Sequence, residues 1–251
     1  MRIPGFPDAH LTYCLNIHPG ETLEENEAAI RKHAARVKEL VSPREPFGLG
    51  LRLGRNAADK LADPARLKAF GRMLADGGMY AFTVNGFPYG AFHGTAVKAG
   101  VYRPDWRQPE RLAYTCRLGE LLSALLPEGS EGSISTVPVS YREWMRDERN
   151  GKIASENLAA CAAALHELRN RTGREIHLGL EPEPDCVLET TEDAIAFFER
   201  NLWPVGIAWL AGHGGYSHRN AETVLRRHVG VCFDACHFSV QFEQLDRSLE
   251  T

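Results

Sequence analysis

Short apolar runs alternate with helical patterns six times along this chain, and that alternation limits the folds open to it. The strand-like runs lie at residues 11–16, 47–53, 79–85, 133–139, 175–181 and 230–234. The helical patterns lie at about 22–41, 63–76, 109–126, 155–171, 191–202 and 220–228. Strands that alternate with helices predict a parallel sheet with right-handed crossover connections.

Several helix ends carry recognisable signals. Thr22 and Glu25 form a capping-box pattern, and Asp63 before Pro64 is typical of a helix start. The pair Gly77-Gly78 predicts the end of the second helix. Two segments lack such a pattern. Residues 85–106 are aromatic and glycine-rich, which favours an ordered lid, and residues 203–215 are expected to be irregular.

The repeated unit favours a parallel (β/α) TIM barrel over an open doubly wound sheet. No Gly-x-Gly-x-x-Gly pattern follows a strand, and the units are evenly spaced over a single domain, residues 1–251. A closed barrel of this type needs eight strands, whereas about six βα units are present. We expect a truncated barrel that lacks the last two units. Completion by another chain or an open sheet with an exposed edge are the alternatives.

Composition excludes some classes of function. A net charge of −4 gives no basic surface for a phosphate backbone, so nucleic acid is not the expected partner. The six cysteines are scattered without a Cys-x-x-Cys pair, which favours buried reduced thiols. The sequence shows no signal-peptide core and no transmembrane run. We expect a cytoplasmic protein with a small-molecule partner, and leave a homo-oligomer open.

Two strand ends carry residues suited to chemistry. Glu181 ends the fifth predicted strand, Asp234 ends the sixth, and His237 follows three residues later. Carboxyl ends of barrel strands form the active-site face. Carboxylate oxygens suit Mg²⁺ or Mn²⁺, and an added histidine shifts the preference toward Mn²⁺, Co²⁺ or Zn²⁺. We predict Glu181, Asp234 and His237 as metal ligands. Glu181 as a surface carboxylate and Asp234 as a helix cap remain alternatives.

Four further residues are candidates for substrate binding. His18 follows the first strand, Asn85 ends the third, and His93 lies in the long aromatic segment. Arg142 follows the fourth strand and could hold a phosphate or carboxylate. Solvated loop histidines and a surface ion pair of Arg142 are the alternatives.

The two strand ends also support a resemblance. Leu180-Glu181-Pro182 and Phe233-Asp234-Ala235-Cys236-His237 resemble the fifth- and sixth-strand signatures of the xylose-isomerase-like TIM barrels. That superfamily includes sugar isomerases, epimerases and endonuclease IV. The resemblance implies that the glutamate and aspartate bind a divalent metal. It implies for His237 a contact with a substrate oxygen, as in the isomerases, or with metal, as in endonuclease IV.

A closer resemblance covers nearly the whole chain and is carried by residues 11–21 and 85–90. These segments resemble the EboE family of TIM-barrel proteins, which belongs to a bacterial operon assigned to metabolite traffic. The superfamily has two further metal ligands on strands seven and eight, which this chain lacks, so the resemblance implies that the chain binds metal weakly or not at all. Endonuclease IV-like enzymes have histidines at the tips of strands three and four. Asn85 and Val139 stand there instead, which argues against DNA repair.

Together these features predict a metal-dependent isomerase or epimerase acting on a small hydroxy-carbonyl or sugar-like metabolite, such as a sugar phosphate. Glu181 and His237 are the expected catalytic residues, with Glu181, or a partner on the missing eighth strand, as the proton-transfer base. No nucleotide cofactor is expected. A non-catalytic metabolite carrier and a metal-dependent hydrolase are the alternative functions.

Overall fold

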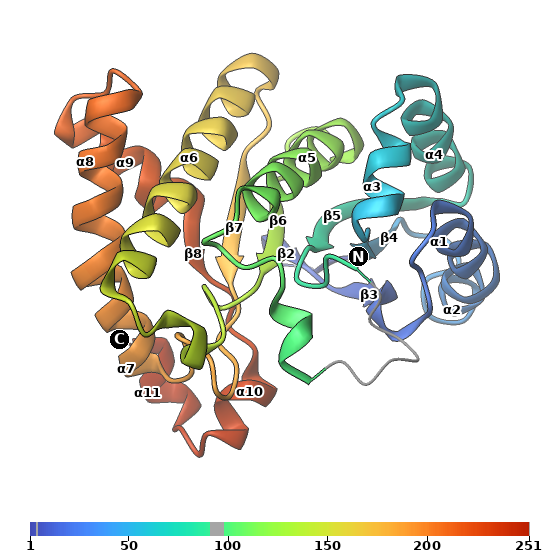
Figure 1. Ribbon diagram of the computed structural model, residues 1–251. Helices are drawn as coiled ribbons and strands as arrows, with labels where there is room; N and C mark the ends of the chain where they lie inside the picture. Colours follow the sequence, from blue (N-terminus) through green and yellow to red (C-terminus); the bar gives the residue numbers. More distant parts are fainter. Residues whose placement is uncertain (4, 91–97, 251) are drawn as a thin grey trace. The chain divides into compact units, whose positions relative to one another are not determined.

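The computed structural model describes residues 1–3, 5–90 and 98–250 (Figure 1). The chain forms two compact units, each assembled from separate stretches of sequence. The first unit contains Met1–Val101, Arg117–Ile134 and Leu168–Ile176, and the second contains Tyr102–Cys116, Ser135–Glu167 and His177–Thr251. Each unit is described by itself below.

A six-stranded parallel sheet confirms the predicted β/α architecture. Its strands follow the order of the sequence: β3 (Thr12–Cys14), β4 (Phe47–Arg52), β5 (Met79–Asn85), β6 (Gly132–Thr136), β7 (Ile176–Leu180) and β8 (Val229–Val231). Sequential parallel strands with intervening helices are the arrangement of a TIM barrel. The outer strands β3 and β8 do not pair with each other among the described residues, so the barrel is not closed.

In the first unit the predicted helix signals are confirmed. Thr22 and Glu25 form the capping box that begins a continuous helical run. That run comprises α1 (Leu23–Ala29), the π-helical turn η2 (Ile30–Ala34) and α2 (Ala35–Val41). Asp63 caps α4 (Pro64–Asp76) by accepting a hydrogen bond from the backbone N–H of Arg66 at 2.9 Å.

Two elements of the first unit were not predicted. The strands β1 (Arg2–Ile3) and β2 (Phe6–His10) form an antiparallel hairpin, although this stretch lacks an alternating pattern. The short helix α3 (Arg55–Leu61) lies between the second predicted strand and the second predicted helix, and its buried face is provided by Ala57, Ala58 and Leu61. Both elements are too short for a periodic pattern to stand out in the sequence.

The helices of the second unit correct one prediction. Residues 203–215 are not irregular, because α8 (Trp203–His213) continues from the helical residues of α7 (Thr191–Phe197) and η5 (Phe198–Leu202). Gly206 serves packing here, since a Cβ at this position would lie 2.8 Å from Leu225 Cδ2. Leu225 belongs to α9 (His218–His228), which lies beside α8 in Figure 1.

The predicted helices at 109–126 and 155–171 are both present, and the first has nearly the expected bounds. α5 (Pro109–Leu125) matches its prediction, whereas α6 (Glu148–Thr172) begins seven residues before the predicted start. The short helices α10 (Ala235–Val240) and α11 (Leu245–Glu250) complete the chain, and Figure 1 shows both near the carboxyl end of β7. Among the described helices, none combines the length and apolar character needed to cross a bilayer.

Two further predictions depend on burial. Cys161 and Cys186 are buried as expected, but Cys14, the last residue of the edge strand β3, and Cys236, in the first turn of α10, are exposed. Of the predicted lid, residues 91–97 lie outside the described residues. Trp106 is fully buried and donates its backbone N–H to Val139 O at 3.0 Å, so it belongs to the core of the second unit.

Candidate metal centre at the ends of β7 and β8

Glu181 is the first residue after β7, and two features of the second unit hold it there. The strand itself is anchored by Ile176, Leu178 and Leu180, all fully buried. The backbone N–H of Glu181 donates to Thr136 O at 3.0 Å, which extends the pairing beyond the strand end. Because successive side chains alternate along the strand, the buried Leu180 leaves Glu181 on the other face. Its side chain is only 13% exposed.

The chain after β8 brings Asp234 and His237 to the same place. Cys232 donates its backbone N–H to Leu180 O at 2.8 Å. Cys232 also lies close to Gly179, since a Cβ added to this glycine would be 3.1 Å from the Cβ of Cys232. Asp234 then caps α10, accepting hydrogen bonds from the backbone N–H groups of Cys236 at 2.8 Å and His237 at 3.4 Å. Asp234 is therefore the helix cap that we considered and, at the same time, a member of the cluster.

The imidazole of His237 faces both carboxylates. Its Nδ1 lies 3.7 Å from Glu181 Oε1 and 3.5 Å from Asp234 Oδ2. One ligand atom from each of the three residues lies within 4.8 Å of the others. Nδ1 is buried yet has no hydrogen-bond partner in the described structure. Two ligands that share one ion at about 2.1 Å each stand roughly 3–3.5 Å apart, so the residues present fit a divalent cation.

The charges around the cluster also favour a bound cation. Burial raises the pKa of Glu181 to about 7, and the charges of Glu183 and Asp234 add to this effect while His237 opposes it. Burial, together with the charges of Glu181 and Asp234, raises the pKa of Cys232 to about 12. The cluster thus carries more negative charge than its surroundings compensate. A bound cation relieves that excess directly.

A third carboxylate, that of Glu183, was not predicted from the sequence and lies on the other side of the imidazole. Glu183 Oε1 is 3.6 Å from His237 Nε2. The hydroxyl of Tyr102 donates to Glu183 Oε2 at 2.6 Å, and burial with this hydrogen bond raises the pKa of Tyr102. Carboxylates commonly orient metal-binding histidines in this way. The available signal was the second glutamate in the run Leu180-Glu181-Pro182-Glu183.

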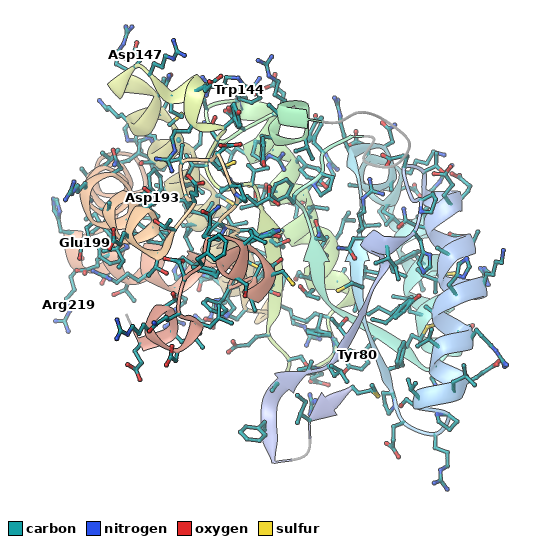
Figure 2. All side chains as sticks on the ribbon, turned by 90° about the horizontal axis from the view of Figure 1, so that it is seen from below. Tyr80, Trp144, Asp147, Asp193, Glu199 and Arg219 are labelled. Atoms are coloured by element: carbon teal, nitrogen blue, oxygen red, sulfur yellow. The ribbon has the colours of Figure 1, made fainter. Side chains whose placement is uncertain are left out.

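Aromatic side chains continue from Tyr102 within the second unit. Tyr102 stacks on Tyr141 with ring centroids 5.9 Å apart, and Tyr141 meets Trp144 edge-on at 5.4 Å (Trp144 is labelled in Figure 2). The guanidinium of Arg103 lies 4.4 Å from the centre of the Trp144 ring. Such a packed row keeps the Tyr102 hydroxyl in place against Glu183.

Arg142, a predicted substrate-binding residue, is committed to other partners in the structure. It begins the 3₁₀ turn η4 (Arg142–Met145), and its Nη2 donates to Glu189 Oε2 at 2.9 Å and to Asp193 Oδ2 at 3.0 Å (Asp193 is labelled in Figure 2). Its side chain is 49% exposed. This geometry matches the ion-pair alternative, and a substrate contact of Arg142 stays a prediction.

Two of the other predicted substrate-binding residues, His18 and Asn85, belong to the first unit. In the first unit, His18 Nε2 is 2.8 Å from the hydroxyl of Tyr13, and its ring stacks on His33 with centroids 4.3 Å apart. Asn85 Oδ1 accepts the backbone N–H of Phe87 at 3.2 Å, which fixes the turn after β5. His93 lies outside the described residues. Roles of these three residues in substrate binding stay predictions.

Comparison with known proteins gives distant structural likenesses. No protein-family model matches the chain, and no curated protein matches its sequence. The 3-keto-D-glucoside 4-epimerase YcjR of Escherichia coli is 15% identical with a TM-score of 0.49, covering 97% of this chain and 74% of its own. A xylose isomerase-like TIM barrel protein of Mycobacterium smegmatis, crystallised with magnesium, is 14% identical with a TM-score of 0.46, covering 91% and 89%.

A third solved structure, the IolI protein with a bound zinc atom, is 11% identical with a TM-score of 0.41, covering 96% of this chain and 94% of its own. At these identities and scores, the likenesses concern the fold alone. The strand order and the cluster of Glu181, Asp234 and His237 are observed in this chain itself.

Proposed function

We propose that this protein is a divalent-metal-dependent isomerase or epimerase acting on a small hydroxy-carbonyl or sugar-like metabolite. One observation carries the proposal: the buried, unpartnered Nδ1 of His237 faces carboxylate oxygens of Glu181 and Asp234 at 3.7 and 3.5 Å. A histidine and two carboxylates suit Mn²⁺, Co²⁺ or Zn²⁺, with Mg²⁺ a weaker match because of the imidazole.

The three residues of the cluster have two roles, cation binding and proton transfer. Glu181, Asp234 and His237 hold the cation, which when bound makes a carbon-bound proton beside a hydroxy-carbonyl group more acidic. Glu181 directs Oε1 toward His237, so its second oxygen, Oε2, is left to take that proton and return it. Return of the proton to the neighbouring carbon, with a hydroxyl proton passing from one substrate oxygen to the other, isomerises the substrate. Epimerisation instead requires that a second proton donor act on the opposite face of the same carbon. No redox cofactor is needed for either outcome.

Glu183 and Tyr102 act on the imidazole and not on substrate. Glu183 faces Nε2 of His237 at 3.6 Å, and Tyr102 fixes the Glu183 carboxylate through its 2.6 Å hydrogen bond. With the proton on Nε2, beside the Glu183 carboxylate, the lone pair of Nδ1 would be available to hold a cation together with Glu181 and Asp234. The pair therefore selects the imidazole tautomer that binds metal.

We further propose that the metabolite belongs to the pathway of the EboE family. This finer assignment is supported by the sequence resemblance at residues 11–21 and 85–90. The chemistry above does not depend on it.

The test begins with Mn²⁺ and Co²⁺ affinity, compared with Asp234→Asn and a matched surface control, Asp147→Asn. Asparagine at 234 can still cap α10 but removes one charge, whereas Asp147 pairs only with its neighbour Arg149 among the described residues. We expect one ion per chain, lost in the first variant and retained in the second. Substoichiometric binding at millimolar Mn²⁺ by the wild type contradicts the metal site.

Activity is then tested by incubating the metal-loaded protein with small ketoses and hydroxy-ketones in D₂O. Proton transfer at carbon places deuterium next to the carbonyl group, which mass spectrometry detects even when turnover is slow. We expect exchange that depends on metal and is lost in Asp234→Asn. Metabolite binding without exchange would instead identify a carrier.

A further inference from the structure

The first unit contains a pocket that plays no part in the proposed function. It has a volume of about 820 Å³ and lies at the amino ends of β4 and β5, whereas the metal centre follows the carboxyl ends of β7 and β8. Its wall comes from the hairpin strand β1, the segment before β4, β5 itself, and the segment before β6. The volume is that of a typical small-molecule site.

One part of the pocket wall is apolar and stiff. Val41, Pro43, Pro46 and Pro127 contribute to it, and proline rings have few conformations to lose when a ligand binds. The backbone carbonyl of Pro127 accepts a hydrogen bond from Arg174 at 2.9 Å. This part of the wall is therefore already in place before a ligand arrives.

The rim of the pocket is positively charged. Arg2 and Arg44 both line it and are both exposed, and Glu45 is the one acidic residue among the lining residues. Arg44 makes no hydrogen bond or ion pair within the described part of the chain, and none joins it to Glu45. Arg2 donates to the hydroxyl of Ser130 at 3.1 Å, a neutral partner. No ion pair joins either guanidinium to a carboxylate of the described residues.

The remaining walls are tied down by hydrogen bonds. The hydroxyl of Tyr80, labelled in Figure 2, lies 2.8 Å from His10 Nδ1 and thus connects β5 with the hairpin. Leu11 donates its backbone N–H to Met1 O at 2.7 Å, which holds the hairpin closed. Ser42 donates its hydroxyl to Glu45 O at 3.2 Å and shapes the segment before β4. Arg2 and Arg44 are thereby presented from two anchored segments.

We propose that this pocket binds a small organic anion, with a phosphate or carboxylate held by Arg2 and Arg44 and a flat apolar body against Pro43, Pro46 and Pro127. Guanidinium groups match the planar, two-oxygen geometry of such anions. A bare inorganic ion would leave the apolar wall of the pocket without a partner, so the wall favours a ligand that has an apolar body. The site is independent of the metal centre and of the reaction proposed there.

The probes are phenyl phosphate and benzoate, with phenol as the neutral counterpart and inorganic phosphate as the counterpart without an apolar body. Titrations by calorimetry or NMR use the full chain at low salt with EDTA, so that metal plays no part. We expect both organic anions to bind with a dissociation constant of about 1 mM or below, and both counterparts to bind at least about tenfold more weakly.

Variants locate the binding. Arg44→Gln and Arg2→Gln are each expected to weaken the organic anions about tenfold. The control Arg36→Gln removes an exposed arginine that pairs with Glu39 outside the pocket, and it should change nothing. The proposal is overturned if neither probe binds, if phenol binds as well as benzoate, or if Arg44→Gln and Arg36→Gln behave alike. Loss of binding in Asp234→Asn, with retention in Arg44→Gln, would move the anion to the metal centre and also overturn it.

Discussion

Replacing Glu181 by glutamine should stabilise the metal-free protein while abolishing metal binding. Glu181 has its pKa raised from an ordinary value of 4.5 to about 7, chiefly by burial. The difference is about 2.5 pKa units at about 1.36 kcal/mol each, which corresponds to about 3 kcal/mol. A neutral amide of nearly the same size avoids the cost of burying the charge. If Glu181 only supported the fold, its substitution would lower the unfolding free energy of the protein.

The sign follows from proton binding. Between pH 4.5 and 7 the folded protein keeps a proton on Glu181 that the unfolded chain has released, so stability falls as pH rises through this window. The contribution is near zero below pH 4.5 and is fully unfavourable above pH 7. The wild type should therefore lose about 2–3 kcal/mol relative to Glu181→Gln between pH 5 and pH 8.

Urea denaturation in EDTA at several pH values measures this difference directly. Addition of Mn²⁺ at pH 8 should then raise the stability of the wild type, by mass action, and leave Glu181→Gln unchanged. If the two proteins keep a constant difference in unfolding free energy from pH 5 to pH 8, Glu181 is not the strained, buried carboxyl that the structure describes.

The remaining predictions concern the neighbours of Glu181. His237→Leu should weaken Mn²⁺ binding at least about 100-fold, whereas His213→Leu, at an exposed position of α8, should not change it. Glu183→Gln and Tyr102→Phe should each weaken it about tenfold, measured by isothermal titration, because the imidazole loses its orienting partner; unchanged affinity in both would exclude that role. Arg142→Gln should lower the unfolding free energy by less than about 1 kcal/mol, since its ion pairs are half-exposed, and a larger loss in chemical denaturation would contradict this.

Local signals predicted most of the secondary structure. The strand Met79–Asn85 has the bounds expected from its apolar run, and the capping box at Thr22 and the cap at Asp63 begin helices as expected. These features depend on neighbours a few residues apart along the chain. A local rule is sufficient wherever the deciding contact is itself local.

The failed predictions involve contacts between distant residues. Residues 203–215 were expected to be irregular, but Gly206 lies inside α8. A glycine is needed at this position because Leu225 of another helix fills the space that a side chain would occupy. The hairpin of β1 and β2 joins the rest of the first unit through His10 and Tyr80, seventy residues apart. A single sequence does not show which of its weak signals such contacts reinforce.

For the candidate site, the sequence by itself determined which chemical groups stand at two strand ends. Glu181, Asp234 and His237 were identified from their positions after apolar runs. Only the tertiary structure decided that their ligand atoms meet within 4.8 Å, and that Tyr102 reaches Glu183 across 81 residues of chain. It also decided the charge state of Glu181, because burial and the proximity of other carboxylates are properties of the folded protein.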